Sequence, residues 1–165
     1  MYVAQPLSQD HNLGDFDCGK EDLSDWLKKY ASHAEAMRTA RTFVWTRQDE
    51  AHVLAYYSIA GHAIEKAQVP PKIGRGGPEQ IPAVILARLA LDRQLQGQGL
   101  GSRLLIDALN RMVRASKEVA FRLVVVDAID EEAALFYEKY GFRRIPGDMR
   151  LVRKLSDIER DLSDL

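Results

Sequence analysis

The sequence predicts an α/β domain built around a buried central strand. Segments rich in β-branched and aromatic residues alternate with segments whose apolar residues recur every three or four positions. The run AVILARLAL, residues 83–91, is almost continuously apolar, which is typical of a strand covered on both faces. It leads into the glycine-rich QGQGLG, residues 96–101, and then into an amphipathic segment. Because 165 residues suit one core, we expect a single domain over 1–165.

Four elements are expected in the first 65 residues. The alternation and turn signals predict a strand at 3–7, a helix at 20–37 and a β-hairpin with strands at 42–46 and 52–64. The helix would bury one apolar face, formed by Leu23, Trp26, Leu27, Tyr30 and Ala34. The polar connection at 47–50 separates the two hairpin strands.

The second half begins with a long irregular loop at 69–82, which holds four of the six prolines and three glycines. The elements expected after it are strands at 83–91, 121–126 and 150–154 and helices at 102–117 and 130–140. Gly141 is a natural stop for the last of these helices. The tail at 156–165 has helical spacing, so a short amphipathic helix, an interface segment and a disordered end all remain open.

Composition narrows the class of protein. Hydrophobic residues make up 46% and charged residues 28%, as in ordinary globular domains. No apolar run approaches the roughly 20 residues of a membrane helix, and the N-terminus lacks the pattern of a secretory signal. The single cysteine, Cys18, excludes an internal disulfide, and the four histidines have no ligand spacing. We therefore expect a cytoplasmic protein without a metal and without a membrane partner.

Charge is distributed unevenly along the chain. Residues 1–35 carry a net charge of −4 and residues 156–165 a net charge of −3, whereas residues 36–155 carry +6. A basic body suits an anionic ligand or a nucleic acid, although an ordinary mixed surface explains the charge alone equally well.

The segment at 96–101 has the features of a phosphate-binding loop. Glycines allow positive φ angles and close approach of a ligand, and the N–H groups at a helix start bind phosphate oxygens. Gln96, Gly99 and Gly101 could therefore hold a pyrophosphate, or simply form a strand-to-helix turn. The absence of Gly-Lys-Ser/Thr argues against a Walker-type nucleotide site, and GxGxG departs from GxGxxG.

Gln96-Gly97-Gln98-Gly99-Leu100-Gly101 matches the Q/R-x-x-G-x-G/A signature of GNAT acetyltransferases, and the chain resembles that family over about residues 40–155. ILARLALD and VVVDAIDEEAALFYEKYGF look like its central strand and second core motif. The resemblance implies a GNAT fold: a central mixed β-sheet of six to seven strands with splayed central parallel strands, flanked by about four helices. It implies acetyl-CoA as co-substrate.

Cofactor contacts follow from the same resemblance. The thioester would lie near Leu89, Ala90 and Leu91. The pyrophosphate would lie on Gln96, Gly97, Gln98, Gly99, Leu100, Gly101 and Ser102.

A closer resemblance is to the GNAT toxins of bacterial toxin–antitoxin modules. FDCG at 16–19, RTFV at 41–44, AYYSIA at 55–60 and AQVP at 67–70 carry it, together with the two core motifs. It implies a toxin that acetylates the α-amino group of aminoacyl-tRNA, blocks translation and is neutralised by a ribbon-helix-helix antitoxin. A homodimer fits the family. The alternatives are a GNAT enzyme acting on a small-molecule or protein amine, and a non-catalytic acyl-CoA-binding regulatory module.

Tyr137 is the candidate catalytic residue, because the family places a tyrosine there near the thiol. A phenol of pKa near 10 can donate a proton to a thiolate of pKa about 8.5. The central strand has no carboxylate before Asp92, so no general base is evident. That absence fits an α-amine, of pKa near 8, better than a lysine amine of pKa about 10.4. Asp127 or Glu132 could still act through water.

Basic residues are the candidates for contact with tRNA phosphates. Those expected to bind the tRNA are Arg38, Arg41, Lys72, Arg75, Arg88, Arg143 and Arg144, with Arg150 as a further candidate. Arg88 stands out because it interrupts an apolar strand, so we expect it to face a cleft or pair with an acid. A solvated surface charge is the alternative for each of the others.

Overall fold

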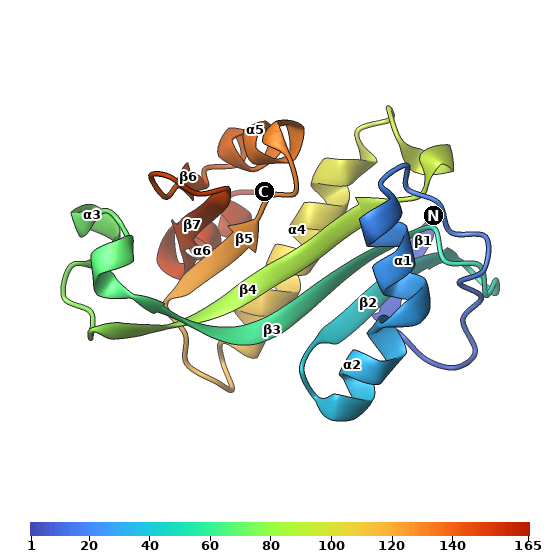
Figure 1. Ribbon diagram of the computed structural model, residues 1–165, viewed down its shortest axis with the longest axis horizontal. Helices are drawn as coiled ribbons and strands as arrows, with labels where there is room; N and C mark the ends of the chain where they lie inside the picture. The colour runs from blue at the N-terminus through green and yellow to red at the C-terminus, as the bar shows by residue number, and fades with distance from the viewer. The chain divides into compact units, whose positions relative to one another are not determined.

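Seven strands form one mixed sheet in the order β1-β2-β3-β4-β5-β7-β6 (Figure 1). The structure is a computed structural model that describes all residues, 1–165. Its strands are β1 (Tyr2–Pro6), β2 (Arg41–Arg47), β3 (Ala55–Glu65), β4 (Gln80–Leu91), β5 (Leu123–Asp127), β6 (Arg143–Arg144) and β7 (Arg150–Lys154). Its α-helices are α1 (Glu21–Lys29), α2 (Ala31–Met37), α3 (Pro71–Gly74), α4 (Leu100–Ala115), α5 (Glu131–Lys139) and α6 (Leu155–Ser163). Two 3₁₀ helices are η1 (Lys66–Gln68) and η2 (Arg93–Leu95).

The pairing of the strands explains why the sequences of β4 and β5 are mostly apolar. They pair in parallel, with Leu86 opposite Val126 at the end of the register. The pairs β1–β2, β2–β3, β5–β7 and β6–β7 are antiparallel. Four successive residues of β5, Leu123 to Val126, are fully buried, as expected for a strand covered on both faces.

The chain divides into two compact units, which are described separately. The first comprises Met1–Ala60 and Arg88–Ala108, and the second comprises Gly61–Ala87 and Leu109–Leu165. Three elements, β3, β4 and α4, have residues in both units. The assignment of 1–165 to a single GNAT domain stays a prediction.

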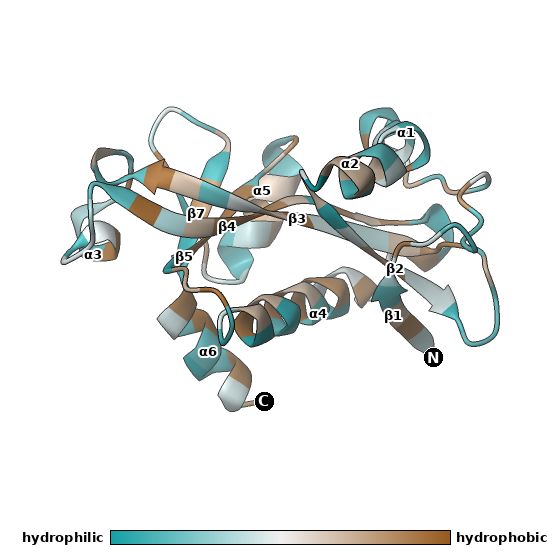
Figure 2. Cartoon of the chain, turned by 90° about the horizontal axis from the view of Figure 1, so that it is seen from below, coloured by the Kyte–Doolittle hydropathy of each residue, from teal (hydrophilic) through white to brown (hydrophobic).

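The core of the first unit lies between α1 and the strands. Phe16, Leu27, Val44, Tyr56 and Ala90 belong to one buried cluster. The Tyr56 hydroxyl donates to the Leu23 carbonyl of α1 at 2.6 Å, which satisfies a buried polar group and ties helix to strand. Figure 2 shows α1 and α2 on one face of the strands of this unit and the first turns of α4 on the other.

The core of the second unit is built on β4, β5 and β7. Its buried cluster includes Ile81, Leu123, Val125 and Val152, and Ile73 of α3 packs into it. Helix α6 buries Leu155 and Ile158. The tail therefore forms an amphipathic helix, which is one of the three outcomes that the sequence left open.

The helix predicted at 20–37 is two helices. The backbone leaves helical geometry at Tyr30, with φ −122° and ψ −22°, and Tyr30 is 57% exposed. The change of direction lets Leu27 of α1 and Ala31 of α2 enter the same core cluster, each fully buried. Packing of both apolar segments thus outweighs helix propensity.

The loop predicted at 69–82 is more ordered than expected. Pro71 occupies the first position of α3, where its missing N–H costs nothing. Strand β4 already begins at Gln80, and β6 was not predicted at all because it has only two residues. Counting α3, α6 and the division at Tyr30, the structure has six α-helices rather than about four.

Candidate active site

The glycine-rich segment forms an exposed turn between η2 and α4. Gly97 and Gly99 have φ angles of +77° and +76°, the left-handed region that favours glycine. No atom lies within 4 Å of a Cβ built on either residue, so both backbones face open space. Helix α4 begins at Leu100, and the N–H groups of its first turn have no partner within the helix. Two left-handed glycines thus precede a helix start; that this turn binds a phosphate stays a prediction.

The side chain of Gln96 stabilises this turn through two hydrogen bonds. Gln96 Nε2 donates to the carbonyl of Cys18 at 2.7 Å and to that of Leu91 at 2.9 Å. The Gln96 side chain therefore does not extend toward a ligand. It fixes the end of β4 and the start of the turn to the FDCG segment, so its contribution to phosphate binding comes from positioning the backbone.

The carboxylate of Asp92 also stabilises the end of β4 and the start of the turn. It is 4% exposed, and its carboxylate accepts the N–H groups of Asp17 at 3.1 Å and Gln94 at 3.0 Å. Arg93 Nε donates to Asp17 Oδ2 at 3.0 Å. These contacts explain the FDCG motif, which the sequence marked by resemblance only. They also remove Asp92 from consideration as a base, since both carboxylate oxygens hold backbone.

Cys18 packs in the core of the first unit. Its thiol is buried, donates to the Lys20 carbonyl at 3.3 Å and lies 3.3 Å from Ser24 Oγ. It supports the start of α1 and is not exposed for chemistry.

Strand β4 continues beyond its pairing with β5. The register ends at Leu86, five residues before the end of β4 at Leu91. Leu89 and Leu91 are half-buried, whereas Ala90 is buried in the core of the first unit. The segment at 89–91 thus has a strand edge that β5 does not cover, where an extended ligand can pair with backbone.

Tyr137 lies on α5 with its ring buried and its hydroxyl unpaired. It is 5% exposed and packs edge-on against Phe136 and Phe142, at centroid distances of 5.4 and 5.8 Å. Burial raises the pKa of the phenol above its usual range, so it is protonated at neutral pH. The hydroxyl donates to no protein acceptor and is not sealed from solvent. Tyr137 is therefore a protonated phenol without a hydrogen-bond partner in the protein.

Asp127 is held by Arg150 in a two-point ion pair. Arg150 Nε and Nη2 donate to the two carboxylate oxygens at 2.7 and 3.0 Å. Arg150 Nη1 lies 3.2 Å from Nε2 of His62 on β3. Asp127 is thus committed to a structural contact, which weakens the prediction that it acts as a base through water. Glu132 is exposed in the first turn of α5.

Burial of His62 and its contact with Arg150 together predict a pH dependence of stability. Burial first, and then the Arg150 charge, lower the pKa of His62 below its ordinary value. The unfolded chain therefore takes up this proton first as the pH falls, and stability is lost from about pH 6.5 downward. We expect the Tm of the native protein to fall more between pH 7.5 and 5.5 than that of His62→Gln. Exposed His33 on α2 supplies the control, His33→Gln, which should keep the native slope; equal slopes in all three proteins would contradict the prediction.

The candidate tRNA contacts divide into engaged and unengaged cations. Arg41 pairs with Glu35 at 2.7 Å, and Arg144 pairs with Glu131 and Glu138 at 2.6 and 2.9 Å. Each of these ion pairs links two neighbouring elements. Because the acids lie against the guanidinium groups, the charges of Arg41 and Arg144 are largely compensated. Exposed cations without an acidic partner are Arg38, Lys72, Arg75 and Arg143.

Arg88 pairs with no acid. Its guanidinium carbon lies 3.9 Å from the centroid of the Trp26 ring, and Trp26 in turn stacks on Tyr56. A cation–π contact thus replaces the ion pair that was one of the two expected outcomes. Burial lowers the pKa of Arg88, although an arginine remains charged.

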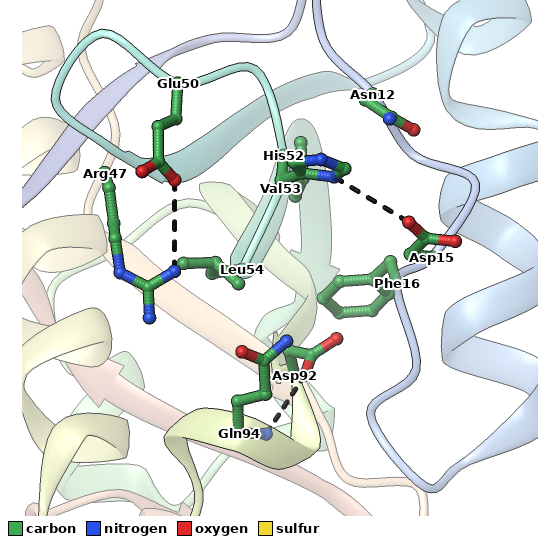
Figure 3. Close-up of a pocket in the computed structure, with 10 residues that line it drawn as sticks. All are labelled: Asn12, Asp15, Phe16, Arg47, Glu50, His52, Val53, Leu54, Asp92 and Gln94. Atoms are coloured by element: carbon green, nitrogen blue, oxygen red, sulfur yellow. Dashed lines mark hydrogen bonds and ion pairs between the residues drawn. The ribbon is translucent and has the colours of Figure 1, made fainter.

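A separate pocket of about 220 Å³ lies in the first unit (Figure 3). Figure 3 shows two contacts on its walls, between the side chains of His52 and Asp15 and between those of Arg47 and Glu50. Asp92 lines it as well, so carboxylates outnumber guanidinium groups. A polyanionic cofactor is disfavoured in such a pocket.

No three histidine, cysteine or acidic side chains come together in a way that could hold a metal ion. No helix has the length and apolar character needed to cross a membrane.

Comparison with known proteins decides the family. The profile of the acetyltransferase (GNAT) domain matches residues 39–144. The chain belongs to the GNAT family. A tRNA-acetylating toxin of Mycobacterium tuberculosis (strain ATCC 25618 / H37Rv) is 33% identical over 159 residues, which covers 96% of this chain and 95% of the relative.

Solved structures of GNAT toxins have the same fold. AtaT complexed with acetyl-methionyl-tRNAfMet superposes with a TM-score of 0.89 at 32% identity, covering 97% of this chain and 98% of AtaT. A variant of AtaT bound to the C-terminus of the antitoxin AtaR and to acetyl-CoA gives a TM-score of 0.86 at 30% identity, with 99% of both chains covered. The expected GNAT fold, with a mixed sheet of seven strands, is confirmed, and this GNAT chain is an N-acetyltransferase.

Proposed function

We propose that this GNAT protein is a toxin that uses acetyl-CoA to acetylate the α-amino group of aminoacyl-tRNA and so blocks translation. The observation that carries the proposal is similarity along nearly the whole chain to AtaT bound to acetyl-methionyl-tRNAfMet. A small-amine acetyltransferase would need to share only the GNAT core. Here the similarity includes the FDCG segment and α1, which lie outside the matched profile.

The chain's own residues would hold acetyl-CoA in two places. The glycine turn, Gln96 to Gly99, and the first turn of α4, Leu100 to Ser102, would receive the pyrophosphate on backbone N–H groups. The uncovered edge of β4 at 89–91 would pair with the pantetheine arm. Acetyl-CoA supplies the acetyl group as a thioester.

Tyr137 would supply the proton of the reaction. The amine nitrogen forms a bond to the thioester carbonyl carbon, the carbon–sulfur bond breaks, and the thiolate takes the phenolic proton. The amine loses its proton to solvent. The phenolate of Tyr137 then takes up a proton from solvent, which restores the phenol. A phenol is protonated at neutral pH, and burial raises the pKa of Tyr137 further, so the proton is present throughout the neutral range.

The engagement of Asp92 and Asp127 in structural contacts fits the proposed acceptor. Asp92 holds backbone and Asp127 holds Arg150, so neither carboxylate is free to take the amine proton directly. An α-amine with a pKa near 8 is already partly neutral at pH 7.5, and an aminoacyl ester lowers that pKa further.

The proposal extends to partners and location. The AtaT complex with AtaR supports a small antitoxin as the protein partner, with a ribbon-helix-helix DNA-binding domain as in the toxin–antitoxin family. A toxin that acts on charged tRNA would work in the cytoplasm. A homodimer remains a prediction, and light scattering of the purified protein would test it.

The deciding experiment is an acetylation assay with radiolabelled acetyl-CoA. The purified protein would be incubated with a mixture of charged tRNAs, and separately with uncharged tRNA, polyamines and a lysine-rich peptide. We expect label on charged tRNA alone, and hydrolysis of the ester should release an N-acetylated amino acid whose identity names the preferred acceptor.

Two outcomes would contradict the proposal. Label on a polyamine or on the peptide, with charged tRNA untouched, would leave a GNAT enzyme of different specificity. Binding of acetyl-CoA without transfer to any acceptor would favour the non-catalytic regulatory module.

A further inference from the structure

The second unit contains a pocket lined largely by basic side chains. Its volume is about 150 Å³, the space of about five water molecules. Four cations line it: Lys72 of α3, Arg143 of β6, and Arg153 and Lys154 at the end of β7. Figure 1 shows α3 and the β6–β7 pair within this unit. We call this set of four residues the basic pocket.

The charge of the basic pocket is not balanced by its acids. Asp157 is the single carboxylate on its wall, and Arg160 lies 3.5 Å from that group. Arg153 pairs with Asp161 of α6. Lys72, Arg143 and Lys154 have no acidic partner, so the pocket presents three uncompensated positive charges. Such a concentration of charge attracts an anion.

Neighbouring residues hold Arg153 in place in the wall of the basic pocket. Arg153 is only 14% exposed, and a Cβ added to Gly141 would lie 2.7 Å from its Nε atom. Glycine at 141 therefore both ends α5 at a φ of +89° and leaves space for the arginine. Asp161 pairs with the Arg153 guanidinium. Because Gly141 and Asp161 both lie against this guanidinium, its position in the pocket wall is restricted.

The chemistry of these groups identifies the ligand class. Lysine and arginine side chains converging from three segments bind phosphate oxygens, and they carry no information about a base. The ends of three separate elements suit a phosphodiester backbone that passes over the surface better than an enclosed small molecule. We propose that the basic pocket binds a backbone phosphate of the acceptor tRNA. This inference rests on the proposed function.

Binding of uncharged tRNA tests the pocket without the reaction. We expect Lys72→Gln/Arg143→Gln to bind tRNA roughly tenfold more weakly at low salt, with the slope of log K against log salt smaller by about one for each cation removed. Arg114→Gln removes an exposed cation from the last turn of α4 and should keep the native slope. Unchanged affinity and slope in the double variant would overturn the assignment.

Two further arms separate the alternatives. Calorimetry with inorganic phosphate should show no strong site; phosphate binding that the double variant loses, with tRNA affinity unchanged, would assign the pocket to a free anion and overturn the proposal. With charged tRNA, the double variant should raise KM and keep kcat. If the native protein acetylates no charged tRNA, the proposed function fails; if it does and the variants match it, only the basic pocket fails.

Discussion

Tyr137→Phe is expected to lower kcat for acetylation of charged tRNA by about 10²–10⁴-fold, the usual contribution of a positioned proton donor. The ring packs between Phe136 and Phe142, and the hydroxyl makes no hydrogen bond within the protein. Removal of one oxygen atom therefore leaves the packing intact and no polar group unpaired. We expect the Tm and the Kd for acetyl-CoA to stay at their native values while turnover is lost. Growth arrest on expression should disappear with it.

Tyr140→Phe is the matched control for this substitution. Tyr140 lies three residues further along, is half-buried and packs on Phe136 at 5.2 Å between ring centroids. It loses the same atom from the same aromatic group, yet should retain activity and toxicity. Full activity of Tyr137→Phe, or equal losses in the two variants, would mean that the thiolate takes its proton from another group.

The central features of the site could be predicted because they depend on local sequence. A continuous apolar run, glycines at alternate positions and a following amphipathic helix specify the strand, turn and helix without reference to distant residues. The structure accordingly has Gly97 and Gly99 in left-handed conformations immediately before α4. The end of α5 at Gly141 was predictable for the same reason.

Contacts between distant segments could not be predicted from periodicity. Gln96 lies 78 positions from Cys18, and no spacing rule indicates that its amide holds that carbonyl. Arg144 looked like a candidate for phosphate binding, because the sequence does not reveal that Glu131 and Glu138 already compensate it. Nor does the sequence indicate that the Arg88 guanidinium stacks on the Trp26 ring.

The same limit applies to the basic pocket. Lys72 and Arg143 were both candidates for tRNA contact, but the sequence separates them by about 70 positions and gives no reason to join them. For Arg153 and Lys154 the sequence predicts only that they belong to a strand at 150–154. Their common location follows from the pairing of β6 with β7 and from the packing of α3 into the core of that unit.

Gly99→Val is expected to weaken acetyl-CoA binding by about tenfold or more. A β-branched residue in the left-handed region costs about 1–2 kcal/mol, and a change of 1.4 kcal/mol corresponds to a factor of ten in Kd. Space around a Cβ at Gly99 is free, so the valine can be accommodated without a clash. The strain is relieved when the backbone leaves its φ of +76°, and this movement turns the N–H groups of the loop away from the pyrophosphate. Calorimetry with acetyl-CoA measures the loss directly.

Gly147→Val separates backbone strain from loss of the phosphate site. Gly147 has a φ of +80°, is exposed and likewise has no atom within 4 Å of an added Cβ, so its valine variant carries the same local cost. It lies in the turn between β6 and β7 and should bind acetyl-CoA with native affinity. Equal weakening in the two variants would attribute the effect to general destabilisation. Native affinity in Gly99→Val would mean that the cofactor phosphates do not depend on this turn, because a backbone forced out of its left-handed conformation could not keep the same N–H groups directed at them.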